Sequence, residues 1–284
     1  MKPRSITVFS HSRPGETGGA LRRIAELAAE GGVEVRLPPA EIAKHGLVPG
    51  TVEARPGGGA ADTDLAVVLG GDGTILTHLR GFAGTGVPVF AVNFGAIGFL
   101  ATVEPWEIDE GVKRALAGEV NAMELPGLVI DTSGGQQLAV NDISFHRRPE
   151  GRVAELAYSV QEEDLGEVRC DGLVVSTPAG STGYNLANGG PVLAWGVEGY
   201  IVSFIAPHTL TARSLVVAPD DTLEVTNRST REEVNVTTDG QPVCTLAPEA
   251  TMQVRFEHNK ALLAQNPDAT FYHRLRDKFG RLSY

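Results

Sequence analysis

The sequence predicts two domains, an α/β domain built on an open parallel sheet and, after it, a mostly antiparallel β domain. Of the 284 residues, 42% are hydrophobic and 21% are charged, which suits a folded chain of about two domains. Strand-like and helical patterns alternate up to about residue 105, and strand-like segments dominate from there on. The 34 glycines gather in loops beside the strands, where a backbone can approach a ligand closely.

The first domain is predicted from a run of alternating elements. Asp64–Leu69 is almost continuously apolar, which is typical of a strand that is buried on both faces of a parallel sheet. The glycine-rich segment 50–62 predicts a surface loop. The other predicted elements, in chain order, are a strand at Ser5–Ser10, a helix at Gly19–Glu30, a strand at Val33–Leu37, a helix over 74–82 and a strand at Val87–Asn93.

The second domain is predicted from short strand-like segments that are separated by Gly, Pro and Asn-Asp. They follow a short helix, Ile108–Ala117, and are Gly127–Thr132, Gln137–Phe145, Ala154–Gln161, Gly172–Ser176, Tyr200–Ile205, Ser214–Val217, Thr222–Thr226, Glu233–Thr238 and Thr251–Phe256. A last helix, Ala269–Phe279, is expected to pack back on the first domain. We therefore assign residues 1–105 and the tail 257–284 to the first domain, and 106–256 to the second.

Charge and cysteine content exclude several classes of function. Lys and Arg number 24 against 35 Asp and Glu, so the net charge of −11 disfavours nucleic acid or an anionic membrane as the main partner. Cys170 and Cys244 are too few for a disulfide framework, and no Cys/His spacing indicates zinc. We expect a cytoplasmic protein, because the sequence has neither a signal-peptide pattern nor an apolar run of about 18 residues.

Residues 67–76, VVLGGDGTIL, pose the first question about chemistry. An Asp-Gly pair between two apolar runs is a hairpin signal, but the helical spacing after residue 74 favours a strand, a glycine loop and a helix. The loop matches neither the dinucleotide fingerprint nor a Walker loop. We predict that Gly70, Gly71, Gly73 and Thr74 form a phosphate-binding loop, and that Asp72 takes a proton from a hydroxyl group.

Residues 170–191, CDGLVVSTPAGSTGYNLANGGP, form the most polar glycine-rich stretch. Its hydroxyl and amide side chains suit a ribose, phosphates and base edges, and the alternative is a pair of ordinary turns. Residues 93–100, NFGAIGFL, predict another loop, either facing a ligand through Gly95 and Gly98 or placing Phe99 and Leu100 in the core.

Residues 137–145, QLAVNDISF, predict a strand with Asn141 and Asp142 in its middle. Both types are disfavoured there, so a strand end or a bulge is the alternative. Basic residues also lie near the predicted loops of the second domain, where they form either a solvated face or a clamp for phosphates: Arg147, Arg148, Arg152 and Arg169.

Together these segments resemble the NAD kinases of bacteria, over most of the chain after residue 64. The matching motifs are GGDGT (70–74), NFGAIGFL (93–100), VNDIS (140–144), CDGLVVSTPAGSTGY (170–184), NGGP (188–191) and PHTLTARSLVV (207–217). GGDGT alone is not specific, since diacylglycerol kinases, sphingoid kinases and some phosphofructokinases share it. The STPxGSTxY and HTLxxR segments are specific.

The resemblance implies phosphoryl transfer from ATP or polyphosphate to the 2′-hydroxyl of the adenosine ribose of NAD, which makes NADP. It implies a Rossmann-like N-terminal domain, an all-β C-terminal domain, a homodimer or homotetramer, and Mg²⁺ or another divalent cation with the donor phosphates. Asp72 would be the general base. The residues implied in NAD binding are Asp72, Gly73, Asn141, Asp142, Arg152, Arg169, Asp171, Thr182, Gly183, Tyr184, Asn185, Leu186, Ala187 and Gln241.

Three positions depart from the family pattern. Asp142 stands in place of glutamate, Gly183 in place of alanine and Ser214 in place of proline. The shorter acid keeps open a second reading, a non-catalytic NAD(P)-binding sensor. A third reading is a lipid or sphingoid kinase with the same GGDGT core, which would need an apolar or basic membrane-facing surface.

Overall fold

A computed structural model describes residues 2–47, 54–149 and 151–280 and divides the chain into two compact units. The first unit comprises Met1–Glu124 and Ala261–Tyr284, and the second comprises Leu125–Lys260. The first therefore extends about 20 residues beyond the boundary expected near residue 105. The reason is that the apolar face of the helix Ile108–Ala117 joins the core of the first unit through Val112, Ala115 and Leu116.

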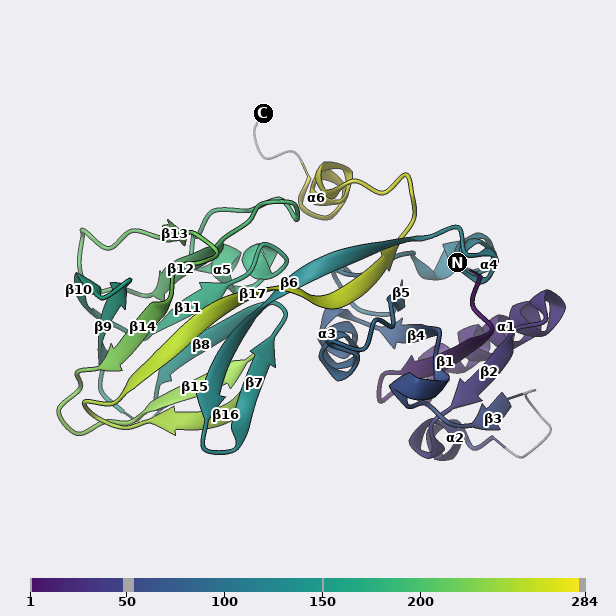
Figure 1. The fold of residues 1–284 in the computed structure, drawn as a ribbon, viewed down its shortest axis with the longest axis horizontal. Coiled ribbons are helices and arrows are strands. Elements are labelled where there is room, and N and C mark those ends of the chain that lie inside the picture. The colour runs from purple at the N-terminus through teal and green to yellow at the C-terminus, as the bar shows by residue number, and fades with distance from the viewer. Residues whose placement is uncertain (1, 48–53, 150, 281–284) are drawn as a thin grey trace. The chain divides into compact units, whose positions relative to one another are not determined.

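The first unit contains a parallel sheet with the strand order β3-β2-β1-β4-β5, drawn in purple and blue in Figure 1. Its strands are β1 (Ser5–Ser10), β2 (Glu34–Leu37), β3 (Ala54–Pro56), β4 (Leu65–Gly70) and β5 (Val89–Asn93). Leu263 of β17 (Thr251–Gln265) pairs in parallel with Val89. Strand β3 lies in the segment 50–62 that was predicted as a loop, of which residues 50–53 are outside the described residues.

Helices α1 and α4 bury their apolar faces in the core that also contains the strand residues Val67 and Phe90. Helix α1 begins at Pro14, five residues before the predicted start, because proline is pre-set for the first helical turn. The helices of this unit are α1 (Pro14–Gly31), α2 (Pro39–His45), α3 (Asp72–Gly81), α4 (Ile108–Ala117), α6 (Phe271–Phe279) and two short 3₁₀ turns, Ala60–Asp62 and Pro105–Glu107.

The second unit is a pair of antiparallel sheets with a shared apolar core. One sheet has the order β13-β12-β11-β8-β15-β16, and the other contains β10-β9-β14-β17. Phe145 and Val175 from the first sheet and Leu156 and Val225 from the other belong to one buried cluster. The remaining elements, also labelled in Figure 1, are a hairpin of β6 and β7, the 3₁₀ turn Gly180–Thr182 and the short helix α5 (Tyr184–Ala187).

The strands of this unit follow the predicted segments closely, with additions. They are β6 (Asn121–Thr132), β7 (Gly135–Ala139), β8 (Asp142–Arg147), β9 (Ala154–Val160), β10 (Glu163–Cys170), β11 (Gly172–Ser176), β12 (Tyr200–Ile205), β13 (Leu215–Val217), β14 (Leu223–Asn227), β15 (Val234–Thr238), β16 (Gln241–Leu246) and β17. The single strand predicted over Gln137–Phe145 is wrong, because the chain breaks between β7 and β8 at Val140 and Asn141.

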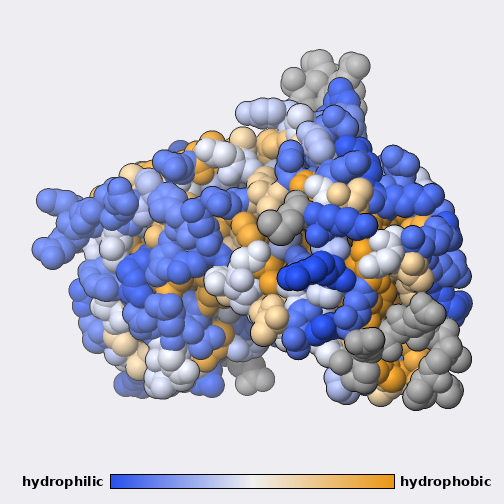
Figure 2. All heavy atoms as spheres, turned by 45° about the vertical axis from the view of Figure 1, so that its right-hand side comes forward, coloured by the Kyte–Doolittle hydropathy of each residue, from blue (hydrophilic) through white to orange (hydrophobic). Residues whose placement is uncertain are grey.

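The surface drawn in Figure 2 is mainly hydrophilic, with apolar side chains in small groups. Within the described ranges, no helix has the length and apolar character needed to cross a membrane.

Candidate functional site

The glycine loop after β4 opens directly into α3. Helix α3 begins at Asp72 with Gly71 as its N-cap, so the structure has the strand–loop–helix arrangement rather than a hairpin. A Cβ on Gly70 would lie 2.6 Å from the Thr74 side chain, and one on Gly95 would lie 2.6 Å from the Cα of Gly71. The glycines are therefore required for close packing. The N–H groups of the first helical turn point out of the helix end, which favours an anion.

Asp72 is half-buried, and each oxygen of its carboxylate accepts a backbone N–H. Leu100 N–H donates to Oδ1 at 2.9 Å, and Phe99 N–H donates to Oδ2 at 3.1 Å. The Phe99 and Leu100 side chains are buried, as expected if they enter the core. The backbone N–H groups of the same two residues orient the Asp72 carboxylate. A carboxylate has about four acceptor positions, so Asp72 keeps capacity for a hydroxyl donor.

The predicted pair Asn141 and Asp142 lies at the break before β8, and Asp239 makes that break. The Asp239 carboxylate accepts the N–H groups of Val140 at 3.0 Å, Asn141 at 2.7 Å and Asp142 at 3.1 Å. Sequence reasoning missed Asp239. The Asp-Gly pair at 239–240 indicates a turn, but no local pattern relates Asp239 to residues 140–142, which are nearly 100 positions away.

Asp142 is only 7% exposed. Burial, with the nearby Asp239 charge as the second cause, raises the pKa of Asp142 to about 7. Near neutral pH its carboxyl group therefore exists in both protonation states, and it can either donate or accept a hydrogen bond. The side-chain oxygen of Asn141 is buried and accepts no hydrogen bond from the described residues.

The loop after β11 packs directly on Asn141. Thr177 Oγ1 donates to the Val140 carbonyl at 2.6 Å, and Thr177 N–H donates to the Asn141 carbonyl at 2.9 Å. A Cβ on Gly180 would lie 2.1 Å from that same Asn141 oxygen. The packing thus requires glycine at 180 and joins the two segments that the sequence singled out separately.

Several polar side chains of this loop are used within it. Ser181 and Asn185 are fully buried; Ser181 Oγ donates to Pro178, and Asn185 Nδ2 donates to the carbonyls of Ser181 and Pro191 at 2.9 Å. Among the predicted contacts, Thr182 and Leu186 are half-buried, whereas Gly183, Tyr184 and Ala187 are exposed. Asn185 therefore holds the loop together through its amide nitrogen.

Tyr184 joins a polar group on the neighbouring strands. Its ring stacks on His146 with 5.6 Å between the centroids, and His146 Nε2 lies 2.7 Å from Ser144 Oγ. Burial raises the pKa of Tyr184, and the charges of Asp142 and Asp171 raise it further. Asp171 binds Arg147 Nε at 2.6 Å. His146 was missed by sequence reasoning, since nothing in its local pattern separates it from other strand residues.

His146 and Arg147 also line a cavity of about 640 Å³ in the second unit, together with Asn235, Thr237 and Cys244. None of the predicted NAD contacts is among the residues that line this cavity. Arg169 forms an ion pair with Glu155 at 3.2 Å, while Arg152 and Gln241 are exposed.

The described residues contain no group of three or more His, Cys, Asp or Glu side chains that would hold a metal ion. Mg²⁺ keeps most of its coordination to water and donor phosphates and takes one or two carboxylates from a protein.

Comparison with known proteins covers both units. Residues 54–120 match the family model of the ATP-NAD kinase N-terminal domain, and residues 140–265 match that of the ATP-NAD kinase C-terminal domain. A protein named NAD kinase from Gemmatimonas aurantiaca is 36% identical over 223 residues, covering 76% of this chain and 77% of that protein. One from Symbiobacterium thermophilum is 32% identical over 281 residues, covering 97% and 98%.

A solved structure extends the match. The crystal structure of an NAD kinase from Archaeoglobus fulgidus in complex with ATP superposes with a TM-score of 0.72 at 26% identity, covering 97% of each chain. Both units therefore have the fold found in these relatives.

Proposed function

The chain belongs to the NAD kinase family, and from that premise we propose that it transfers a phosphoryl group from ATP to the 2′-hydroxyl of the adenosine ribose of NAD, which makes NADP. The observation that carries the proposal is the carboxylate of Asp72, held by two backbone N–H groups at the start of a helix with acceptor capacity to spare. ATP is the proposed donor because the Archaeoglobus relative was solved with it.

Asp72 is the general base in this proposal. It accepts the proton of the 2′-hydroxyl while that oxygen forms a bond to the γ-phosphorus, and the bond from this phosphorus to the bridging oxygen breaks to release ADP. The N–H groups at the start of α3, beside Gly71 and Gly73, bind phosphate oxygens. Mg²⁺, carried by the donor phosphates, would neutralise the charge that develops on them.

NAD is held in this proposal by polar groups of the second unit. Asn141, Asp142 and Asp171 contact hydroxyl or base-edge donors of the nucleotide. The loop 182–187 contacts the nucleoside, with Tyr184 supplying an aromatic face beside His146. Arg152, Arg169 and Gln241 remain predicted contacts. A homodimer or homotetramer and a cytoplasmic location also remain predictions.

The test is incubation of the purified protein with NAD, ATP and Mg²⁺, with NADP and ADP measured over time. Equal amounts of NADP and ADP are expected. Binding of NAD without NADP formation would favour a sensor, and phosphorylation of diacylglycerol or a sphingoid base instead of NAD would favour a lipid kinase. A parallel reaction with polyphosphate in place of ATP identifies the donor.

A further inference from the structure

Arg274 of α6 is a buried cation in the first unit. Arg274 is only 9% exposed, and its Nη2 donates a hydrogen bond to Gln265 Oε1 at 2.6 Å. Burial lowers the pKa of Arg274 to about 10, although the carboxylates of Asp72 and Glu104 act to raise it. The guanidinium therefore stays charged at neutral pH.

Two further hydrogen bonds of Arg274 go to the segment that holds Asp72. Arg274 Nη1 donates to the carbonyl of Phe99 at 2.7 Å and also to the carbonyl of Ala101. The N–H groups of Phe99 and Leu100 are the two donors on the Asp72 carboxylate. The Phe99 carbonyl thus accepts a hydrogen bond from Arg274, and the Phe99 N–H donates one to Asp72. The three residues therefore form a short chain of hydrogen bonds.

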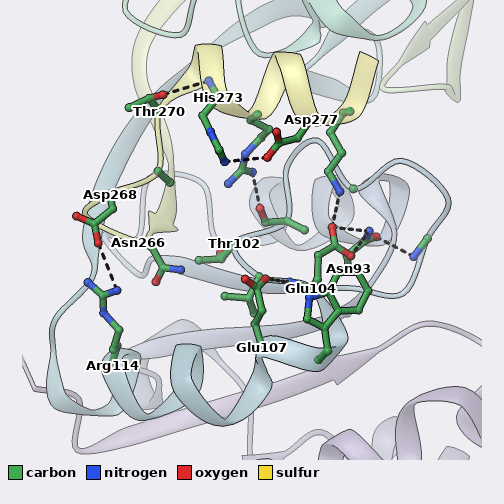
Figure 3. A pocket seen from close by; sticks show the side chains of 18 of the residues that line it. Asn93, Thr102, Glu104, Glu107, Arg114, Asn266, Asp268, Thr270, His273 and Asp277 are labelled. Carbon is green, nitrogen blue, oxygen red and sulfur yellow. Dashed lines mark hydrogen bonds and ion pairs between the residues drawn. The ribbon is translucent and has the colours of Figure 1, made fainter. Parts of the chain in front are cut away.

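A second link ties α6 to the start of the same segment, as Figure 3 shows. Lys278 binds the carboxylate of Glu104, which accepts Asn93 Nδ2 at 3.0 Å. Asn93 Oδ1 in turn accepts Gly95 N–H at 2.9 Å. Aromatic packing adds to these links, because the Phe99 ring lies 5.9 Å from Phe271. Helix α6 therefore holds residues 93–104 at several points.

Arg274 contributes to stability, because its removal would leave the buried backbone carbonyls of Phe99 and Ala101 without this donor. A cation is needed if the carbonyls of Phe99 and Ala101 must be held in one place. Both lie in the segment whose N–H groups set the direction of the Asp72 carboxylate.

We propose that Arg274 is a positioning residue for phosphoryl transfer, which acts on Asp72 through the backbone of residues 99–101. The inference rests on the proposed function, with Asp72 as the base. It makes the C-terminal helix α6 a part of the catalytic apparatus.

The test is a double-mutant cycle with Asp72→Asn, Arg274→Gln and the double variant, measured as kcat and KM for NAD and ATP. Arg274→Gln is expected to lower kcat by about 10- to 100-fold, since a displaced catalytic group loses rate in this range. KM values should stay within about threefold of the wild type. In the Asp72→Asn background, Arg274→Gln should lower kcat by less than about twofold, because the carboxylate that Arg274 positions is already absent.

Matched controls separate positioning from folding. Arg276→Gln changes an exposed arginine on the same helix that pairs with Asp277, and it should keep wild-type kcat. Arg274→Lys keeps a cation that can bind one of the two carbonyls, and its kcat should lie between those of Arg274→Gln and the wild type. This variant also tests the proposal if Arg274→Gln does not fold. Melting temperature and active-site titration are measured for each variant.

The outcomes distinguish the two proposals. A wild-type protein that makes no NADP overturns the proposed function. A wild-type protein that makes NADP, combined with an Arg274→Gln effect of equal size in both backgrounds, overturns the inference and leaves the function standing. An unchanged kcat per folded molecule in Arg274→Gln, with only a lower melting temperature, also overturns the inference.

Discussion

Two glycine-rich loops in this chain use their polar side chains in opposite ways. In the first unit, backbone N–H groups surround one acid, Asp72, whose carboxylate they orient. In the second unit, the hydroxyl and amide groups of Thr177, Ser181 and Asn185 donate to backbone carbonyls. In one loop the backbone positions a side chain, and in the other the side chains position a backbone.

The difference shows that a high density of polar residues in a glycine loop does not make each of them a ligand contact. Among the described residues of the second unit, groups that these hydrogen bonds leave unused include the side-chain oxygens of Asn141 and Asn185, and Tyr184 keeps an exposed ring. Mutations of the two loops should therefore separate chemistry from architecture.

The largest effect is expected from Asp72→Asn. Loss of the base should lower kcat for NADP formation by about 100- to 10,000-fold, the usual share of general-base catalysis. In this variant the NH2 group of the asparagine faces one of the two backbone N–H donors, and this donor–donor contact destabilises the loop locally. Asp109→Asn is the control, because Asp109 is an exposed acid that pairs with Arg23 on the surface. Near-normal kcat in Asp72→Asn would remove this residue from the chemistry.

Asp142→Asn should change the pH dependence of stability. The folded-state pKa of Asp142 is raised from 3.8 to about 7, so the folded protein holds a proton that the unfolded chain has released. Wild-type stability should therefore fall as pH rises from about 4 to about 7, by roughly 4 kcal/mol at most.

The asparagine variant lacks this proton. It should equal the wild type near pH 4 and exceed it in free energy of unfolding above pH 7, in denaturant titrations at both pH values. Parallel curves for the two proteins would show that Asp142 ionises normally.

Gly180→Ala should destabilise the second unit by about 1–3 kcal/mol, the usual cost of overpacking. Its Cβ would lie 2.1 Å from the Asn141 carbonyl oxygen. Gly183→Ala is the matched control in the same loop, because its Cβ would meet the nearest atom, the Gly180 oxygen, at 3.3 Å. Thermal melts should show a clear loss for the first variant and a small change for the second. Equal melts would mean that the loop can move away from Asn141.

The smallest effect on stability is expected from Arg169→Gln. Its ion pair with Glu155 is largely solvent-exposed, and such pairs contribute about 0–1 kcal/mol. If Arg169 binds a phosphate of NAD, KM for NAD should rise by about tenfold or more, which is the loss of one charged hydrogen bond. Arg228→Gln, which breaks a similar surface pair with Glu249, serves as the control. An unchanged KM would remove Arg169 from the site.

Local patterns predicted the elements that local forces build. The spacing of Ile75, Leu76 and Leu79 predicted the helix that follows the glycine loop at Asp72, and these three residues are buried as that spacing requires. Strand β4 likewise follows from its apolar run, which is buried along its whole length.

Distant contacts decided the features that the patterns did not predict. Asp239 breaks the strand predicted over 137–145 from a position nearly 100 residues away, through three backbone hydrogen bonds. The N–H groups that orient Asp72 come from residues 27 and 28 positions further along the chain. Arg274 binds carbonyls more than 170 positions away. No spacing rule relates such residues, since their contact arises only from the folded topology.

The most direct measurement is a crystal structure of the protein with NAD bound. A base must lie within hydrogen-bond reach of the proton it takes, at about 2.6–3.2 Å between heavy atoms. The 2′-oxygen of the adenosine ribose is therefore expected at that distance from a carboxylate oxygen of Asp72. A bound NAD whose adenosine ribose lies beyond the reach of that carboxylate, directly or through one water, would contradict the account.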